Sequence, residues 1–181
     1  MADDQRQQPT PEFSRPVTLS KVPSDGQTLT LSPDDETLAK IAQRFAIPAI
    51  AALDAAFTIM PTAHGVRVEG QFTANLTREC VASLEPMGEV INETITVDFD
   101  RRVEEGDAEA IMDQLAMGQD AEPLRGDHLD LGEFLVQQVS LAMDPFPRKP
   151  GATSLVDRYG AAEEPSAFAA LKSLKPVNDD G

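Results

Sequence analysis

The chain has 181 residues, of which 41% are hydrophobic, so its length and composition fit one ordinary domain with a single core. Thirty-one acidic residues against fifteen basic ones give a formal net charge of -16. This charge repels phosphate backbones and attracts basic proteins, so naked nucleic acid is a poor partner for the surface as a whole.

Cysteine content and hydropathy favour the cytoplasm. Cys80 is the single cysteine, which excludes an intramolecular disulfide framework. The N-terminus lacks the basic and apolar regions of a signal peptide, and no run approaches the roughly 18 apolar residues that span a bilayer. We therefore expect a cytoplasmic protein without a membrane partner.

The N-terminal region predicts a short pair of strands. Residues 1–12 are polar and hold two prolines, so we expect them to be disordered. Residues 13–17 and 27–31 alternate apolar with polar side chains and are separated by the turn-rich residues 23–26, which is typical of paired strands. Pro16 cannot donate to a ladder, which favours an edge position for the first strand.

A helix is predicted next. Ser32 is a candidate cap, Pro33 suits the first helical position, and Pro48 marks the end. Apolar residues follow at helical spacing and predict a stripe that faces a core: Leu38, Ile41, Ala42 and Phe45.

Three alternating segments then predict an antiparallel meander, at about residues 53–61, 65–77 and 89–99. In the third, four apolar residues share one face with Glu93, and the opposite face is polar. One face of the sheet should therefore pack on the helices and the other should face water. The apolar residues of that strand are Ile91, Ile95, Val97 and Phe99, and the polar ones are Asn92, Thr94, Thr96 and Asp98.

Residues 100–128 form an acidic insert. Within it, residues 107–117 fit either a helix or a mobile acidic loop. Asp130 and Glu133 then make a capping-box-like start to a mostly apolar helix that ends near Met143, which we expect to be buried. Its apolar residues are Leu131, Phe134, Leu135, Val139, Leu141 and Ala142.

Residues 144–181 predict an extended, proline-rich tail that ends in a short amphipathic helix at 166–175. Phe168, Leu171 and Leu174 form its apolar stripe, which either packs on the protein's own core or binds a partner. The predicted fold class is α+β: one domain at residues 13–143, with an antiparallel, partly barrel-like sheet of about five to six strands, two main helices and the short C-terminal helix.

No catalytic signature is present, so the sequence predicts neither an enzyme nor a cofactor or small-molecule site. There is no glycine-rich phosphate loop, nucleophile elbow or zinc-protease motif. His64 and His128 lie in a turn and before a helix, where surface or capping roles are favoured. An acidic cluster matches no calcium loop, and a solvated face explains it better than a metal site. Its members are Glu104, Glu105, Asp107 and Glu109.

Basic residues at both ends are candidates for partner binding. If the tail folds back, they could form one basic patch that contacts RNA, although scattered surface charge is the simpler interpretation. With the apolar stripe of residues 166–175, the candidate partner-binding residues are Arg15, Arg78, Arg148, Lys149, Phe168, Leu171, Lys172, Leu174 and Lys175.

Three segments together resemble the YceD-like family, the large ribosomal RNA subunit accumulation proteins of bacteria and plastids. They are residues 76–86, followed by a strand ending at 97–99; residues 129–145; and residues 165–175. The resemblance covers roughly residues 13–175. Many members read C-x-x-C where this chain has Cys80 and Ser83, and one cysteine cannot supply a tetrahedral zinc site. We therefore expect Cys80 to be a small buried residue.

The resemblance implies a role in the synthesis, processing or stability of 23S ribosomal RNA. The leading hypothesis is a non-enzymatic accessory factor that binds a large-subunit assembly intermediate, with the acidic face for basic ribosomal proteins. One alternative is an acidic adaptor that keeps a basic ribosomal protein soluble. The other is a metal-dependent RNA-processing enzyme that uses the acidic cluster.

Overall fold

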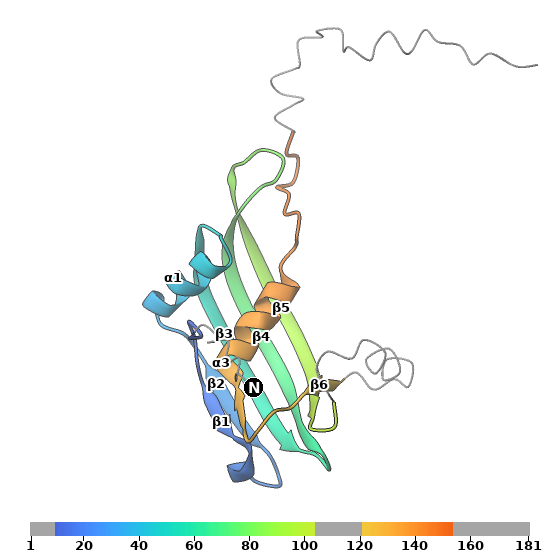
Figure 1. Ribbon diagram of the computed structural model, residues 1–181. Helices are drawn as coiled ribbons and strands as arrows, with labels where there is room; N and C mark the ends of the chain where they lie inside the picture. The colour runs from blue at the N-terminus through green and yellow to red at the C-terminus, as the bar shows by residue number, and fades with distance from the viewer. Residues whose placement is uncertain (1–9, 104–120, 154–181) are drawn as a thin grey trace, which may run out of the picture.

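The computed structural model describes residues 10–103 and 121–153. Its main layer is a five-stranded sheet in the order β2-β3-β4-β5-β6, which is antiparallel except that β6 runs parallel to β5 (Figure 1). The strands are β2 (Gln27–Leu31), β3 (Ala49–Pro61), β4 (Gly65–Glu79), β5 (Pro86–Asp100) and β6 (Ala121–Pro123).

Within the described ranges, two α-helices and a small second sheet accompany the large sheet. In Figure 1, α3 lies over the middle strands of the large sheet, and α1 packs beside β3. The small sheet pairs β1 with β7, and a short 3-10 helix follows β1. The bounds are β1 (Pro16–Thr18), η1 (Leu19–Lys21), α1 (Asp35–Arg44), β7 (His128–Asp130) and α3 (Leu131–Ala142).

The predicted meander is confirmed, with strands longer than expected. Ile91 and Phe99 of β5 are buried on the helix side, while Asn92, Thr94 and Thr96 are exposed. The period-2 alternation therefore reports correctly which face is covered. The sheet stays open at both edges, so the barrel-like part of the prediction is not confirmed.

The core lies between the sheet and the helices. Phe134 of α3 makes edge-to-face contacts with Phe57 of β3 and Phe99 of β5, each with ring centroids 5.6 Å apart. Such aromatic pairs add to the gain from burial alone. The buried residues form one continuous cluster that runs in sequence from Phe13 to Val139.

The predicted helix after β2 is confirmed, but Asp34 caps it instead of Ser32. The Asp34 side chain accepts a hydrogen bond from the amide of Thr37, and the Ser32 hydroxyl donates to Asp54 across the strands. A carboxylate accepts this bond and also suits the positive end of the helix dipole. The two residues before Asp35 are therefore non-helical.

The α1 helix ends in a Schellman turn, which fixes the path of the following chain. The amide of Ile47 donates to the carbonyl of Ala42, and the amide of Ala46 donates to that of Gln43. Ala46 has a φ of 52°, a conformation that glycine adopts more readily. Phe45 and Ile47 stay partly buried against the core, and the turn also brings them beside the end of β4.

The predicted N-terminal strand pair is wrong. β1 pairs with β7, and β2 pairs with β3. Asp127 decides the first pairing: its carbonyl accepts from the amide of Leu19, and its carboxylate accepts from the amide and hydroxyl of Ser20. These bonds hold η1, and therefore β1, against the segment that precedes α3. A distant residue thus outweighs the local turn signal.

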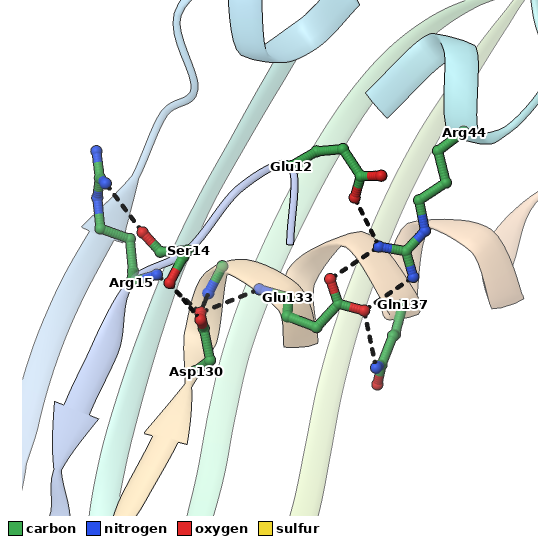
Figure 2. A network of polar contacts seen from close by, with 8 residues as sticks. Glu12, Ser14, Arg15, Arg44, Asp130, Glu133 and Gln137 are labelled. Atoms are coloured by element: carbon green, nitrogen blue, oxygen red, sulfur yellow. Dashed lines mark hydrogen bonds and ion pairs between the residues drawn. The ribbon is translucent and has the colours of Figure 1, made fainter. Parts of the chain in front are cut away.

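Figure 2 shows the polar network that attaches the N-terminal segment to α3. The Asp130 carboxylate caps α3 by accepting from the amides of Gly132 and Glu133, and it also accepts from the Arg15 amide at 2.7 Å and from the Ser14 hydroxyl. The predicted capping role of Asp130 is confirmed. Burial raises the pKa of this carboxyl, but the donated hydrogen bonds outweigh burial and hold the pKa below its usual value.

Arg44 makes the second connection in Figure 2. Its guanidinium donates two 2.8 Å hydrogen bonds to Glu133 and one of 2.9 Å to Glu12. Glu12 is the last residue of the segment predicted to be disordered, and this ion pair links it to α1 and α3. Residues 1–9, the insert helix or loop at 107–117 and the helix at 166–175 lie outside the described residues.

We predict that Asp130→Ala lowers the free energy of unfolding at pH 7 by about 1–2 kcal/mol, because α3 loses its cap and β1 loses an anchor. Asp130→Asn keeps an acceptor but loses the charge. The pKa is lowered in the folded state, so the charge stabilises the fold above about pH 4, and this gain is lost as the pH falls through the lowered folded pKa.

Urea unfolding followed by circular dichroism at pH 7 and near pH 3 measures both effects. Asp25→Ala, in an exposed turn, is the matched control. An Asp130→Asn deficit that does not shrink at the lower pH would contradict the assignment.

Candidate interaction surface at the β4–β5 loop

The proline-rich segment after α3 is tied to the β4–β5 loop (residues 80–85). The amide of Val81 donates to the carbonyl of Pro147 at 3.0 Å. The amide of Lys149 donates to the Sγ of Cys80 at 3.3 Å, and the Lys149 ammonium lies 3.0 Å from the Glu85 carboxylate. The loop and residues 144–151 therefore form one surface at this end of the sheet, where Figure 1 shows the chain running from α3 toward the loop.

A nearly buried ion pair lies beneath this surface. The Arg78 guanidinium donates to Glu89 at 2.7 Å, and the two side chains are only 11% and 16% exposed. Arg78 also donates to the Asp144 carbonyl, and the Asp144 amide donates to Glu89. Each charge has several partners, which is the condition under which a buried pair is tolerated. Arg78 therefore holds the tail in place and is not a free cation for a partner.

Cys80 is buried, as expected, but its surroundings are polar. The Lys149 amide is the main group that favours the thiolate, followed by the Ser83 hydroxyl and the amides of Ser83 and Ala82, and together they lower the pKa of Cys80 to about 7. Burial opposes this shift. The Ser83 hydroxyl is itself buried and makes no hydrogen bond of good geometry within the described residues. Cys80 is therefore a polar anchor for the tail as well as a small core residue.

Two cavities open beside this surface and share Phe45. The first, about 540 Å³, lies between the end of α1 and the end of α3 and includes Arg44, Leu141 and Met143. The second, about 380 Å³, lies between the Schellman turn (residues 45–48), the end of β4 and the proline-rich segment, and its other lining residues are Arg78, Glu79, Val81, Pro145 and Pro147. Both are open grooves with mixed polar and apolar walls. The exposed acidic residue Glu79 lines the second.

Exposed apolar side chains gather at this end of the molecule. Leu141 is 79% exposed and Phe146 is 70% exposed; Val81 and Leu84 lie in the loop. The prediction that Leu141 is buried is wrong, because this side chain faces the open groove between the ends of α1 and α3. We call the surface formed by Val81, Leu84, Leu141 and Phe146 the apolar end.

Leu84 has an unusual backbone. Its φ is 57°, a left-handed conformation that costs a non-glycine residue about 1–2 kcal/mol. Its side chain is 55% exposed, so burial in the described structure does not offset this cost fully. A strained, exposed, apolar loop residue is characteristic of a functional surface.

Among the described residues, the predicted basic side chains lie at different places on the fold. Arg15 lies near the start of α3, stacked over Phe13 at 5.1 Å, while Arg78 and Lys149 lie beyond its other end, about 18 Å along a helix of this length. Arg148 is exposed beside Lys149. The other candidates lie outside the described residues: Phe168, Leu171, Lys172, Leu174 and Lys175.

The metal hypothesis concerns residues that the structure does not describe, since Glu104, Glu105, Asp107 and Glu109 all fall in the gap. Within residues 10–103 and 121–153, no group of three or more His, Cys, Asp and Glu side chains is placed to hold a metal ion. His64 lies in the β3–β4 turn and His128 in β7. No helix in these ranges is long and apolar enough to cross a membrane.

Comparison with known families identifies the chain. The family model described as large ribosomal RNA subunit accumulation protein YceD matches residues 68–175, which is more than half of the sequence. The chain belongs to the YceD family. Searches of curated proteins and of solved structures found no match. The family description assigns its members to the accumulation of large-subunit ribosomal RNA.

The YceD match begins within β4, so it includes the β4–β5 loop, α3 and the proline-rich segment but not α1. Sequence reasoning missed the grooves, because Phe45 and Pro145 meet only in the folded chain. The exposure of Leu141 had no clear signal either, because it lies seven residues after buried Phe134 and therefore on nearly the same side of the helix.

We predict that Cys80 titrates with a midpoint near pH 7 in the folded protein. Absorbance at 240 nm measures the thiolate of the one cysteine, and the one tyrosine, whose phenolate also absorbs there, ionises only near pH 10. The lowered pKa means that the thiolate stabilises the fold, so the stability of the wild type relative to Cys80→Ala should rise from about pH 7 to about pH 9. Urea-unfolded protein is the control, and a folded midpoint at or above 9 would contradict the assignment.

We predict that Arg78→Met or Glu89→Gln alone destabilises the fold by about 3 kcal/mol, because each leaves a nearly buried charge without its partner. The double variant Arg78→Met/Glu89→Gln should lose less than the sum of the two. Urea unfolding of all four proteins gives the coupling energy. Additive losses would show that the pair is not coupled.

Proposed function

We propose that this YceD-family protein is a non-enzymatic accessory factor in biogenesis of the large ribosomal subunit. It promotes the synthesis, processing or stability of 23S ribosomal RNA by binding an assembly intermediate through the apolar end. The observation that carries the proposal is that Val81, Leu84, Leu141 and Phe146 are all exposed inside the region that matches the family, and that Leu141 and Val81 each line one of the two grooves.

Physical chemistry favours a protein partner at this surface. Contiguous exposed apolar side chains mark interaction sites, since leaving them in water costs free energy that binding recovers. The surface is also held in a fixed shape by the Arg78–Glu89 pair and by the contacts of Cys80 and Val81 with the tail. A preorganised surface loses less conformational entropy on binding.

A second candidate function is an acidic adaptor for a basic ribosomal protein. The net charge of -16 favours association with a basic chain. Glu79 supports this candidate, because this exposed acidic residue lines the second groove, where a Lys or Arg of the partner would meet it. This function differs from the first in requiring no RNA in the complex.

We predict that deleting the gene lowers 23S ribosomal RNA relative to the small-subunit RNA, and that Leu84→Asn/Phe146→Gln fails to restore it. Asn tolerates the backbone of Leu84 better than Leu does, and both side chains are exposed, so the fold should persist. Met60→Gln, at the opposite end of β3, is the matched control and should restore the ratio. RNA ratios and sedimentation with precursor particles are measured together.

The outcomes separate the candidates. An unchanged RNA ratio in the deletion strain would reject the role in biogenesis, whereas a lowered ratio fully restored by Leu84→Asn/Phe146→Gln would reject the apolar end alone. Affinity purification after nuclease treatment distinguishes the adaptor: retention of one basic ribosomal protein supports it, and loss of all partners supports binding to an RNA-containing particle.

A further inference from the structure

The outer edge of β5 has no strand beside it over most of its length. β6 pairs only with Asp98, Phe99 and Asp100, although β5 begins at Pro86. Within the described residues, the backbone from 88 to 96 on this side therefore faces no strand. In Figure 1, β6 lies at one end of β5 only.

The hydrogen bonds at the ends of β5 show which backbone groups point outward. The backbone amide of Arg101 donates to the carbonyl of His64, and the amide of Cys80 donates to the carbonyl of Glu85. In this register, the backbone amides and carbonyls of the odd-numbered residues of β5 point toward β4. The even-numbered residues face the edge, and the Asp100 carbonyl confirms this by accepting from Leu124 next to β6. The amides and carbonyls of Val90, Asn92, Thr94 and Thr96 thus point away from the sheet.

This edge carries little of the usual protection against pairing. Natural edge strands carry lysine, proline, a bulge or an inward-pointing charge, and of these residues 90–96 contain only Glu93, on the face that also carries Ile91. Asn92, Glu93 and Thr94 are all exposed although successive side chains point to opposite faces, and Val90 is 65% exposed. A Cβ added at Gly88 would meet nothing within 4 Å. Both faces of the edge are therefore accessible, and its β-branched residues favour an extended neighbour.

Charge identifies the kind of neighbour. Glu89 forms an ion pair with Arg78, and Asp98 forms one with Arg67. The side chain of Glu93, by contrast, has no ion pair or hydrogen bond within residues 10–103 and 121–153. The uncommitted charge on the edge is negative, as is the net charge of the protein. A second copy would bring another charge of -16, and the two-fold register that pairs Val90 with Thr96 would place Glu93 opposite Glu93. Like charges directly opposite destabilise paired strands.

We propose that the edge of β5 at residues 90–96 binds an extended, lysine- or arginine-bearing segment of a basic protein by adding it to the sheet as a strand. Backbone hydrogen bonds supply affinity, and Glu93 selects a basic residue. The inference stands on the geometry of β5 and does not depend on the role in ribosome biogenesis.

The test uses the full chain and a blocked octapeptide of alternating Val and Thr with two lysines on one face. Binding is measured by fluorescence anisotropy and located by amide chemical shifts. We expect shifts centred on residues 90–96. A peptide that is N-methylated at alternate residues cannot form the ladder and should not bind.

Two variants of the protein test the edge directly. Glu93→Lys should weaken binding roughly tenfold more than Asp25→Lys, which changes the net charge equally in a turn before β2. Thr94→Pro removes an outward amide without removing a bond to β4 and should abolish binding. The N-methylated peptide keeps the test decisive if this variant does not fold.

Several results would overturn the proposal. These are equal binding of the N-methylated peptide, shifts located at the apolar end, equal effects of Glu93→Lys and Asp25→Lys, or no binding by the lysine peptide. Amides of residues 90–96 that are already protected from exchange in the free monomer would show that the chain covers its own edge. A dimer in sedimentation that Thr94→Pro dissociates would assign the edge to a second copy.

Discussion

The packing of α3 across the meander is the constraint on which the other features depend. Phe134 contacts Phe57 and Phe99 from two strands, which fixes the position of the helix over the sheet. At its start, Asp130 attaches the N-terminal segment and sets the pairing of β1 with β7. After the end of α3, the contacts of Asp144, Pro147 and Lys149 direct the chain toward the β4–β5 loop. One helix therefore orders both the N-terminal strand and the proline-rich segment.

The proline-rich segment is held in place mainly by hydrogen bonds to its backbone. Three prolines remove amide donors, so the remaining amides of Asp144 and Lys149 find partners in Glu89 and Cys80. Both members of the Arg78–Glu89 pair bind the backbone of Asp144: Arg78 donates to its carbonyl, and Glu89 accepts from its amide. Because these bonds satisfy the backbone, apolar side chains such as Phe146 remain free to face solvent. The apolar end is thus a consequence of where hydrogen-bond partners lie.

Local patterns predicted the parts of the fold that depend on nearest neighbours. Alternation gave the meander and the exposed face of β5, and the Asp130 motif gave the start of α3, because both signals are confined to a few residues. The pairing of β1 failed since it rests on Asp127, more than a hundred residues away. The grooves were not predicted for the same reason, because Phe45 and Pro145 come together only in the tertiary fold. Composition also gave no sign that Arg78, a candidate for partner binding, forms an ion pair with Glu89.

The two proposed surfaces meet on β5, which gives this strand a double role. Its first residues close the loop of the apolar end, and Glu89 holds the tail through Asp144; the next residues, from Val90 onward, present the open edge. A partner strand on that edge would therefore lie beside the ion pair that shapes the apolar end. Because Glu89 both anchors the tail and adjoins Val90, loss of its ion pair with Arg78 would disturb the loop surface and the start of the open edge at once.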